Sequence, residues 1–371
     1  MSKMPAVSIV MPIYNAEPYL TKALESVLGQ TFEDIQVVCV NDGSKDSSLA
    51  TMKEFAAKDD RILILDQENG GYGHAMNSGI AASTGEYIGI LEPDDYILPM
   101  MLEKLYSIAK QEDLDFIRSN YNRMTTDENG IESFQEEKIA NKPEYYGTVL
   151  NPQENLDLFN VRMENWTGIY KADFIKGNNI VFNESPGAAF QDNGFWFQTY
   201  CLAKRIYLVD EAFYCYRVDN AASSINQPNK VFTMLDEYQW MENWLRNHPE
   251  LCERFMGVFE YKKTHNSMFA FSRLADEYRG KFLARYSEEY RQAFSRGDVD
   301  ESLFWDDELA QLKQIVFSPT SYLRDYRKNE AVKDEFNKAC ASGKVALFNY
   351  YVAHEGLKSA LKHALNYIVN E

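Results

Sequence analysis

The chain has 371 residues, a length typical of two or three domains. Its hydrophobic fraction of 45% and charged fraction of 25% are those of an ordinary globular protein, which argues against a disordered or fibrous chain. Because its net charge is −18, the chain is not expected to bind nucleic acid, and an anionic ligand would need a metal ion or backbone N–H groups.

The cysteine pattern and the hydropathy pattern both bear on location. The five cysteines lie far apart and include no C-x-x-C pair, so we expect neither a zinc site nor a set of disulfides. Residues 1–6 lack the basic segment of a signal peptide, and no run approaches about 18 apolar residues. We therefore expect a cytoplasmic protein that is neither exported nor membrane-spanning.

Apolar runs rich in β-branched residues begin at residues 7, 35, 61, 87 and 115, at nearly equal intervals. Between the first two runs, and again before the fifth, apolar residues recur at the spacing of an amphipathic helix. Alternating strands and helices over residues 5–120 predict an α/β fold with a mostly parallel, Rossmann-like sheet flanked by helices on both faces.

Beyond residue 121 this alternation stops. The polar stretch 125–146 predicts a loop or excursion. Shorter elements follow and are able to extend the same sheet: strands at 166–170, 180–182, 206–209 and 212–217, and helices at 172–177 and 192–203.

From residue 230 onward helix formers dominate, while Gly and Pro become sparse. We expect a first domain over 1–229 and a helical C-terminal domain over 230–371. Near its end, one helical face permits contact with a partner or a membrane surface, although core packing is the favoured interpretation; it carries Tyr350, Tyr351, His354, Leu357, Leu361 and Leu365.

Polar loops follow the first four apolar runs. Ligands of open α/β sheets bind beyond the carboxyl ends of the strands, so these loops are the expected site. An Asp at a strand end can accept hydrogen bonds from a nucleoside, and an Asp-rich loop can hold a divalent cation against a diphosphate. Turn formation alone is an equally good explanation of the second loop. The loops are PIYNAE (12–17), NDGSKD (41–46), NGGYG (69–73) and EPDD (92–95).

The segment that begins at Gly71 has the G-x-G pattern of a dinucleotide-binding fingerprint. Met76 occupies the position where that fingerprint needs a small residue, and the segment follows the third strand instead of the first. A nicotinamide or flavin site is therefore disfavoured, and His74 taken alone is more often structural than catalytic.

Five segments in their expected order resemble glycosyltransferase family 2: VSIVMPIYN (7–15), VNDGS (40–44), NGG through NSG (69–79), TGEYI (84–88) and EPDD (92–95). The resemblance is strong over residues 5–120. It implies a GT-A fold, a nucleotide-sugar donor, a divalent metal ion (Mn²⁺ or Mg²⁺) and inversion at the anomeric carbon. It also divides the first domain into a nucleotide-sugar-binding half (5–120) and an acceptor half (121–229).

The resemblance assigns Asp42 to base recognition and Asp94 to metal binding. Two departures stand out, because the usual Asp and Ser of the family are Glu92 and Pro93 here, and the Arg that many members carry before Asn77 is Met76. The implied donor-binding residues are Pro12, Tyr14, Glu17, Asp42, Asn69, Gly70, Asn77, Glu92, Asp94 and Arg217.

The similarity continues more weakly through 186–196, where the family commonly has an acidic pair that opens a helix. Asp192 fits the second acid and is the implied general base, whereas Gln191 replaces the first. Helix capping alone is a competing role for Asp192. Arg217, with Asp219, Asn220, Ser223 and Ser224, is similar to the segment that closes over the diphosphate, and a surface salt bridge is the alternative.

The resemblance implies an inverting, metal-dependent enzyme that transfers a sugar from a UDP-type donor to a hydroxyl of a glycan or lipid-linked glycan, in surface or capsular polysaccharide synthesis. A catalytically degenerate nucleotide-sugar-binding subunit stays open because of the departures at Glu92, Pro93 and Gln191. A sugar-nucleotide pyrophosphorylase is disfavoured, since residues 5–20 contain neither Gly nor Arg. Homo-oligomerisation and peripheral contact with the inner face of the membrane are open.

Overall fold

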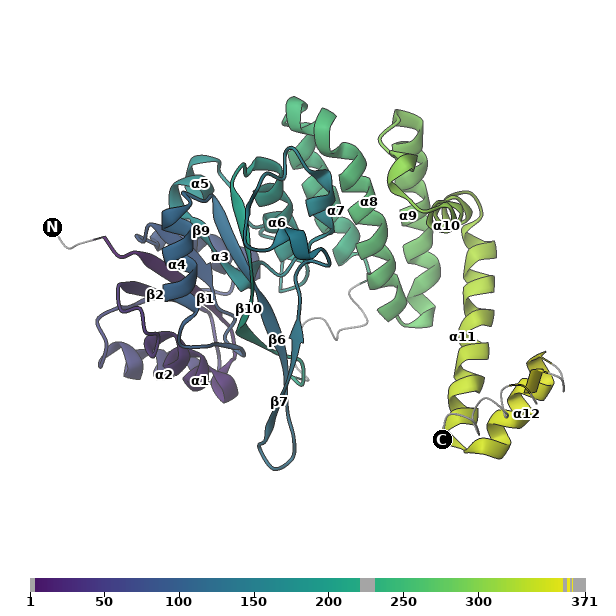
Figure 1. Ribbon diagram of the computed structural model, residues 1–371, viewed down its shortest axis with the longest axis horizontal. Coiled ribbons are helices and arrows are strands. Elements are labelled where there is room, and N and C mark those ends of the chain that lie inside the picture. The colour runs from purple at the N-terminus through teal and green to yellow at the C-terminus, as the bar shows by residue number, and fades with distance from the viewer. Residues whose placement is uncertain (1–3, 221–230, 356–358, 361, 363–371) are drawn as a thin grey trace. The chain divides into compact units, whose positions relative to one another are not determined.

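The computed structural model describes residues 4–220, 231–355, 359–360 and 362. These residues form two compact units, Met1–Arg273 and Leu274–Glu371 (Figure 1). The expectations for Ser223, Ser224, Leu357, Leu361 and Leu365 lie outside the described residues.

The first unit is built on a ten-stranded sheet. Its strands are β1 (Val7–Ile13), β2 (Ile35–Asp42), β3 (Ile62–Gln67), β4 (Tyr87–Ile90), β5 (Tyr96–Ile97), β6 (Phe116–Thr126), β7 (Glu132–Glu137), β8 (Val149–Leu150), β9 (Gly168–Lys171) and β10 (Ile206–Arg217). The order along the sheet is β3-β2-β1-β4-β9-β6-β10-β5, with β7 beside β6 and β8 beside β10. Neighbours among β1 to β4 pair in parallel, as do β6 and β10, while β9 is antiparallel to β4 and β6.

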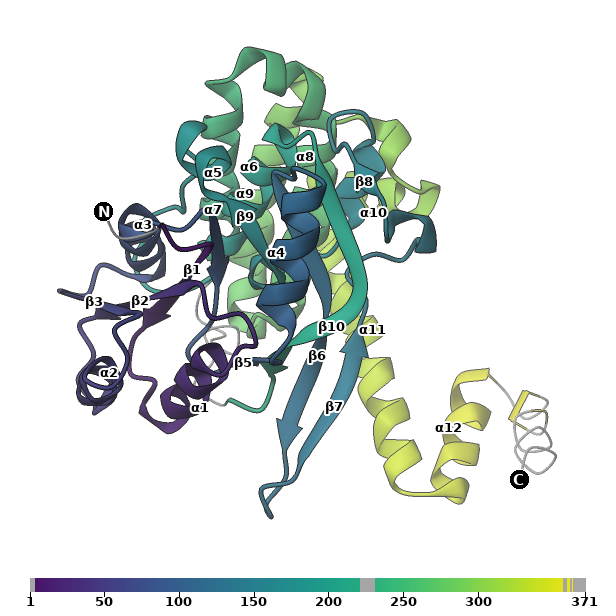
Figure 2. The same cartoon turned by 60° about the vertical axis from the view of Figure 1, so that its left-hand side comes forward.

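The predicted α/β architecture is confirmed. Helices α1 (Glu17–Leu28), α2 (Ser48–Ala56), α3 (Tyr72–Ala82) and α4 (Met101–Gln111) alternate with the first strands. Figure 2 shows α3 on one side of β1 to β3, and α1 and α2 on the other. Covered on both faces, the central strands are mostly apolar, and every residue of β1 is buried.

The middle of the chain differs from the expectation in two places. A strand, β7, forms within the stretch predicted as a loop, and it pairs with β6 as a hairpin. Its four middle residues are exposed and it has no apolar alternation, so its sequence does not resemble a half-buried strand. No strand forms at 180–182, because the side chain of Asn77 takes both backbone hydrogen bonds of Phe182, at 2.9 and 3.0 Å. The other elements are η1 (Pro143–Tyr145), η2 (Leu156–Asn160), η3 (Asn165–Thr167), α5 (Ala172–Gly177) and α6 (Gln191–Leu202).

The two strands predicted at 206–209 and 212–217 are one strand, β10, with an irregularity at the predicted break. Between Val209 and Arg217 it advances eight positions while β6 advances five, from Ser119 to Met124. Side chains alternate between the two faces of a strand, so three extra residues exchange the faces. Leu208 and Tyr214 therefore point to opposite sides of the sheet.

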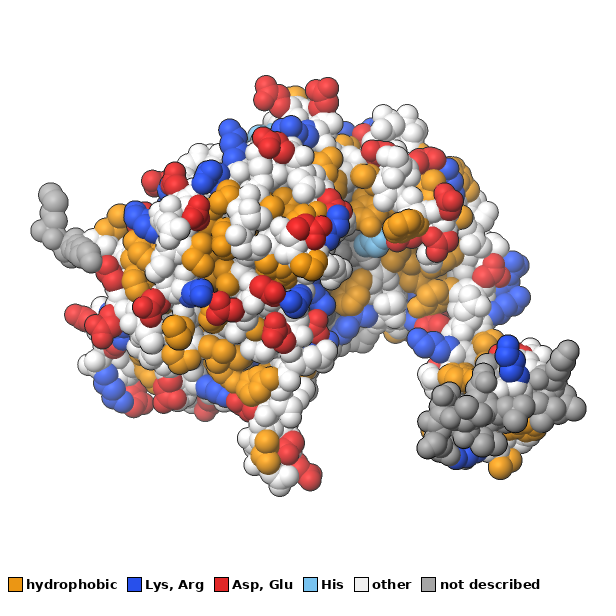
Figure 3. Space-filling model, viewed as in Figure 1, with side chains coloured by type: hydrophobic (Ala, Val, Ile, Leu, Met, Phe, Trp, Pro, Cys, Tyr) orange, Lys and Arg blue, Asp and Glu red, His pale blue; other side chains and the backbone are white. Residues whose placement is uncertain are grey.

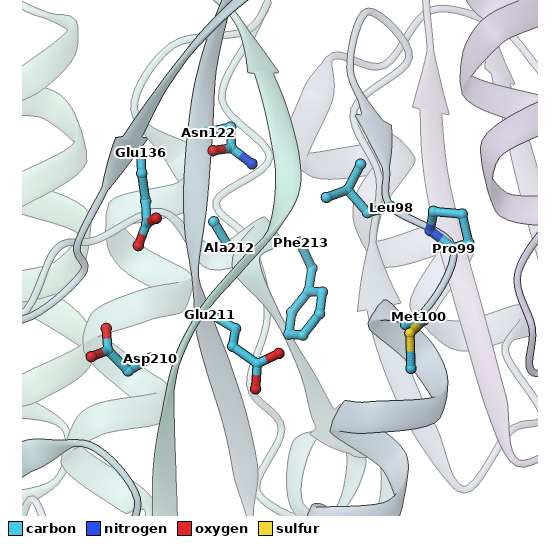
Figure 4. A pocket seen from close by; sticks show the side chains of 9 residues that line it. All are labelled: Leu98, Pro99, Met100, Asn122, Glu136, Asp210, Glu211, Ala212 and Phe213. Atoms are coloured by element: carbon cyan, nitrogen blue, oxygen red, sulfur yellow. The ribbon is translucent and has the colours of Figure 1, made fainter.

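A pocket of about 530 Å³ lies beside this irregularity (Figure 4). Asp210, Glu211, Ala212 and Phe213 line it from β10, opposite the segment around Pro99. None of the residues predicted for the site lines this pocket.

Two further helices belong to the first unit, α7 (Thr233–Arg246) and α8 (Pro249–Arg273). Helix α8 packs on α6 and η2 through aromatic side chains, with ring centroids 5.5 Å apart for Phe197 and Phe259 and 5.4 Å apart for Phe159 and Phe255. Helix α7 packs on α6, where the ring centroids of Phe197 and Trp244 lie 6.3 Å apart. The helical region expected after residue 230 thus contributes its first two helices to the unit that holds the sheet.

The second unit is helical throughout its described part. Its elements are α9 (Asp276–Arg296), η5 (Glu301–Leu303), α10 (Asp306–Phe317), α11 (Pro319–Ala341) and α12 (Lys344–Glu355). Helices α9, α10 and α11 share a small core. Its buried residues include Phe282, Tyr286, Tyr290, Leu312, Ile315, Val316 and Tyr322.

The visible surface is mixed in charge. Figure 3 shows Lys and Arg side chains scattered among acidic ones on this face, with no large basic patch. In the described part of the chain, no helix is both long enough and apolar enough to cross a membrane.

The first turn of α3 lies directly on the backbone of residues 183–187. The N–H of Tyr72 donates to the carbonyl of Gly187 at 2.9 Å. A Cβ atom on Gly73 would lie 1.9 Å from the carbonyl oxygen of Asn183, and Gly71 has φ +88° beside Gly187. Two glycines thus permit a backbone contact that any side chain would prevent.

This contact predicts that Gly73→Ala destabilises the protein. The added methyl group must displace backbone atoms, so we expect a loss of about 1–3 kcal/mol in the free energy of unfolding, measured by denaturant titration. Gly177→Ala is the control, because nothing lies within 4 Å of a Cβ at the end of α5. A Gly73→Ala protein as stable as the control would show that the two segments do not meet as described.

Candidate active site

Asp42 ends β2 and is almost fully buried. Its carboxylate accepts hydrogen bonds from the N–H groups of Gly70 and Gly71, at 2.9 and 3.0 Å, and from the side chain of Gln67 at 2.9 Å. Its backbone carbonyl accepts from Asn69 at 2.8 Å. The predicted residues Asp42, Asn69 and Gly70 therefore lie together, and Asp42 fixes the loop that leads into α3.

Pro12, Tyr14 and Glu17 form the neighbouring edge. Pro12 is buried at the end of β1, and the side chain of Tyr14 is 49% exposed. Glu17 opens α1, and its carboxylate accepts from the backbone N–H of Ser47 at 3.2 Å. These three residues border the loop after Asp42, which leaves the Tyr14 ring available to a ligand.

The acidic loop after β4 holds its carboxylates with neutral partners. Tyr72 donates to Glu92 at 2.7 Å, and Asn220 donates to Asp94 at 2.8 Å. Asp95 is buried and accepts from the Tyr214 hydroxyl at 2.8 Å and from the backbone N–H of Arg217 at 2.7 Å. Both oxygens of Asp95 are therefore engaged, whereas only one oxygen of Asp94 has a partner among the described residues.

Arg217 lies beside this loop but its side chain is only 9% exposed. Its guanidinium donates to the carbonyl of Asp94 at 3.1 Å and to Thr126 at 3.0 Å, and it lies 4.8 Å from the ring centroid of Tyr19. It also pairs with Asp219 at 3.2 Å. In this arrangement Arg217 positions the acidic loop.

Asp192 lies in the first turn of α6. Phe190, the residue just before the helix, has φ +67°, an uncommon conformation for an aromatic residue that turns the chain sharply into the helix. Gln191 is buried, and its side chain holds the turn before α6 in place. Its amide nitrogen donates to the Ser185 hydroxyl at 3.0 Å and to the Gly187 carbonyl at 3.2 Å, and its amide oxygen accepts from the backbone N–H of Ala189 at 2.6 Å. A carboxylate, as the family usually has at this position, would have no proton to donate to the Ser185 hydroxyl oxygen or the Gly187 carbonyl.

The electrostatics bring Asp192 and the acidic loop together. Burial raises the pKa of Asp192 to about 6, with the charge of Glu164 adding to the rise. Burial also raises the pKa of Glu92 to about 8, and the charges of Asp94 and Asp192 add to it. Carboxylates that perturb each other lie within electrostatic reach, so one site contains Asp192, Glu92 and Asp94.

We call Tyr72, Glu92, Glu164, Asn165 and Asp192 the Asp192 cluster. Tyr72 joins its members: burial raises the pKa of its hydroxyl, the charges of Glu92 and Asp192 add to the rise, and the side chain of Asn165 opposes it. Glu164 and Asn165 come from the chain just before β9, so the cluster draws on both halves of the sheet.

Asn77 lies apart from this cluster. Besides holding Phe182, its amide donates to Glu184 at 2.9 Å, and Glu184 also lies 3.2 Å from the ring nitrogen of His74. Its side chain thus joins α3 to the segment before α6. No group of three or more His, Cys, Asp or Glu side chains with metal-binding geometry occurs in the described part of the chain.

Comparisons with known proteins agree with this geometry. A family model described as glycosyl transferase family 2 matches residues 8–185. Glycosyltransferase GlyG of Streptococcus pneumoniae serotype 4 is 31% identical over 221 residues, covering 57% of this chain and 70% of GlyG. The chain belongs to glycosyltransferase family 2.

Two further comparisons extend this result. The chain is 32% identical over 228 residues to EpsJ, an uncharacterized glycosyltransferase of Bacillus subtilis, and spans 64% of its length, less than two thirds. In fold it is similar to residues 1–349 of S. aureus TarS, crystallised with UDP-GlcNAc, with a TM-score of 0.69 at 17% identity and coverage of 87% of this chain and 92% of that one. The fold is therefore of the GT-A type with a helical C-terminal part.

The family 2 match contains the expected positions from Pro12 to Asp94, and Asp192 and Arg217 lie beyond it. Other members of the site were not foreseen. Tyr72 was considered only within the G-x-G pattern, and Glu164 and Asn165 lie in no motif. Only the apolar surroundings of Tyr214 marked it, as part of a strand.

The hydrogen bonds by which Gln191 holds the turn before α6 predict the effect of Gln191→Glu. The change removes two donated hydrogen bonds and buries a carboxylate, so we expect a loss of about 2–4 kcal/mol in unfolding free energy at neutral pH. The buried carboxyl would have a raised pKa, and its protonated form is the tolerated one. Stability relative to wild type should therefore be best at acid pH and decline as pH rises through that pKa, as thermal melts would show. Equal melting temperatures at neutral pH would contradict this role.

Proposed function

We propose that this chain is an inverting glycosyltransferase that moves a sugar from a UDP-type donor to a hydroxyl of a glycan or lipid-linked glycan. The observation that carries the proposal is the pairing of Asp192, whose pKa is raised to about 6, with the acidic loop of Glu92 and Asp94. A carboxylate with a pKa near neutrality is suited to accept a proton at physiological pH.

We assign recognition of the nucleoside to the loops around Asp42 and Tyr14. The crystallised complex of TarS with UDP-GlcNAc supports a uridine donor for this fold. Asp42 has acceptor capacity beyond its three protein donors, because each carboxylate oxygen accepts two hydrogen bonds. Its fixed position at the end of β2 suits it to accept a hydrogen bond from the N–H of a base. Asn69 and Gly70 lie beside it and would form part of the same nucleoside pocket.

We assign metal binding to Asp94. One carboxylate oxygen of Asp94 has no partner among the described residues, and magnesium sites often combine one or two carboxylates with substrate phosphates and water. A single protein ligand is therefore compatible with the absence of a three-residue metal cluster in the described chain. A divalent ion, when bound, would neutralise charge on the departing diphosphate.

The reaction needs few groups from this chain. The acceptor oxygen attacks the anomeric carbon from the face opposite the diphosphate, the bond from that carbon to the diphosphate oxygen breaks, and configuration inverts. The acceptor proton passes to a carboxylate oxygen of Asp192. Tyr72 orients Glu92 through its hydrogen bond. Because the pKa of Glu92 is about 8, its carboxyl group is mostly protonated at neutral pH, which lowers the negative charge of the site.

We further propose that the product belongs to a surface or capsular polysaccharide and that the enzyme works in the cytoplasm, at or near the inner face of the membrane. The family relationship to GlyG and EpsJ supports a role in glycan assembly in general terms. A degenerate subunit would bind nucleotide and turn nothing over, which the measurements below detect.

The raised pKa of Asp192 predicts a pH profile. Only the ionised form accepts a proton, so kcat/KM should rise about tenfold per pH unit up to a pH of about 6 and level off above it. Asp192→Asn should reduce kcat by about 10²–10⁴-fold, and its residual rate should lose that acid limb. Release of UDP from the sugar donor, measured from about pH 5 to pH 8, tests both.

Asp192→Asn retains a side chain able to accept from the turn of α6, so it should fold and bind UDP like wild type. A variant that is folded and transfers sugar at the wild-type rate would remove Asp192 from the proton-accepting role. Attention would then shift to Glu184 or Asp219.

The assignment of Asp94 predicts a loss of metal-dependent nucleotide binding. With ligand at about 100 times its dissociation constant, binding stabilises a folded protein by about 2.7 kcal/mol, which raises its melting temperature. UDP with Mn²⁺ should give this rise in wild type and in Asp210→Ala, a control that removes an acid of the separate pocket. Asp94→Ala should give none beyond the effect of UDP alone. A full Mn²⁺-dependent rise in Asp94→Ala would show that another group holds the ion.

A further inference from the structure

Several polar atoms beside Asp192 are buried and have no hydrogen-bond partner in the described structure. They are Oε2 of Glu164, both polar side-chain atoms of Asn165 and Nε1 of Trp196. The side chains of Asn165 and Trp196 are fully buried. An unpaired buried polar group costs about 1–3 kcal/mol, so a ligand that pairs several of them would bind favourably.

These unpartnered groups lie around the carboxylate of Asp192. Trp196 lies one helical turn after Asp192 on α6, and residues four apart share a helix face. Glu164 acts on the pKa of Asp192, and Asn165 acts on that of Tyr72. The unpartnered atoms are therefore next to the carboxylate that we propose as the base.

Lys262 adds a cation from α8. Its ammonium lies 5.3 Å from the ring centroid of Trp196, and among the described residues it forms no hydrogen bond or ion pair. The side chain is half-buried. Burial lowers its pKa to about 8, and the charge of Glu164 opposes the shift, which sets Lys262 near the same carboxylate.

The hydrogen-bonding groups of these four side chains indicate which class of ligand would bind them. Glu164 Oε2 and the Asn165 oxygen accept hydrogen bonds, whereas the Asn165 amide, the Trp196 N–H and the Lys262 ammonium donate them. A sugar hydroxyl both donates and accepts, so a polyol can satisfy both kinds. A carboxylate or phosphate only accepts, so it would leave Glu164 Oε2 and the Asn165 oxygen without a donor, and it would face the negative charge of Asp192.

We propose that Lys262, with Glu164, Asn165 and Trp196, binds the acceptor sugar next to its reacting hydroxyl, and that this sugar is uncharged. The inference rests on the proposed function and deepens it by naming the acceptor class. Lys262 and Trp196 lie beyond the residues that match the family model, so this part of the site belongs to the chain outside the matched region.

The test compares acceptor classes in wild type, Lys262→Met and Arg254→Met. Arg254 is an exposed cation on the same helix, so its variant controls for the loss of one positive charge. UDP release from UDP-GlcNAc and UDP-glucose is measured with methyl glycosides of neutral hexoses, of uronic acids and of sugar phosphates. Binding of the same glycosides is followed by saturation-transfer NMR, which reports contact without turnover.

Wild type and Arg254→Met should bind and use a neutral hexoside. Lys262→Met should raise the acceptor KM about 10–100-fold, the loss expected for a hydrogen bond to a charged group, with the donor KM close to wild type. A melting temperature near that of wild type would exclude unfolding, and Lys262→Gln replaces the variant should Met destabilise α8.

Three results would overturn the inference: an unchanged acceptor KM in folded Lys262 variants, a wild-type preference for uronic acid or phosphate glycosides, or no NMR contact with any neutral glycoside while donor hydrolysis proceeds. A wild-type protein that neither binds UDP nor releases it from either donor would instead remove the proposed function. The two failures are therefore distinguishable.

Discussion

The close contact between the first turn of α3 and the backbone of residues 183–187 holds the site together. On one side, α3 follows the loop that Asp42 fixes through Gly70 and Gly71, and its Tyr72 holds Glu92. On the other side, the contacted segment leads directly into α6 and Asp192. A single glycine-dependent contact therefore sets the spacing between the nucleotide-side loops and the proposed base, although more than a hundred residues separate them in sequence.

Around this contact the protein holds several carboxylates with neutral donors. Tyrosines donate to Glu92 and Asp95, and an amide donates to Asp94, while the neighbouring Arg217 is occupied with the Asp94 carbonyl, the Thr126 hydroxyl and the carboxylate of Asp219. Raised pKa values mark charged forms that the fold disfavours. The stability contributed by the neutral form is complete below the unfolded pKa and is lost as pH rises through the folded one. A positively charged ligand would relieve this repulsion, which agrees with the divalent ion that we propose for Asp94.

The sequence predicted the parts of the fold that periodicity controls. Continuous apolar runs and helical spacing were enough for β1 to β4, β6 and the helices between them, because those elements are buried in regular patterns. It missed β7, whose two faces are both polar, and it predicted a strand at Phe182, whose backbone is bonded by the side chain of Asn77. The exchange of faces in β10 also escapes periodicity, since it depends on a register with β6.

The candidate site divides in the same way. Contiguous motifs are enough to name Asp42 and Asp94 as candidates from the sequence, and their roles stay predictions. Glu164, Asn165 and Lys262 cannot be named in this way, because each lies in a segment without a motif and approaches the other members of the site only through tertiary packing. For Asn77 and Arg217 the residue was noticed, but its hydrogen bonds became visible only in three dimensions, where both serve to position neighbouring segments.

The packing of α7 and α8 against α6 determines where the polypeptide can be cut. Gly194 of α6 lies against Glu237 and Trp240 of α7, so closely that a Cβ would come within 2.5 Å of the Glu237 carboxylate. A truncation at residue 229 would expose this face, place the buried end of α6 in water and remove Lys262 altogether. A fragment ending after Arg273 would keep the compact unit whole. Chimaeras with other C-terminal modules should therefore be joined after α8. Chimaeras joined at residue 229 would separate Asp192 from the helices that pack around α6.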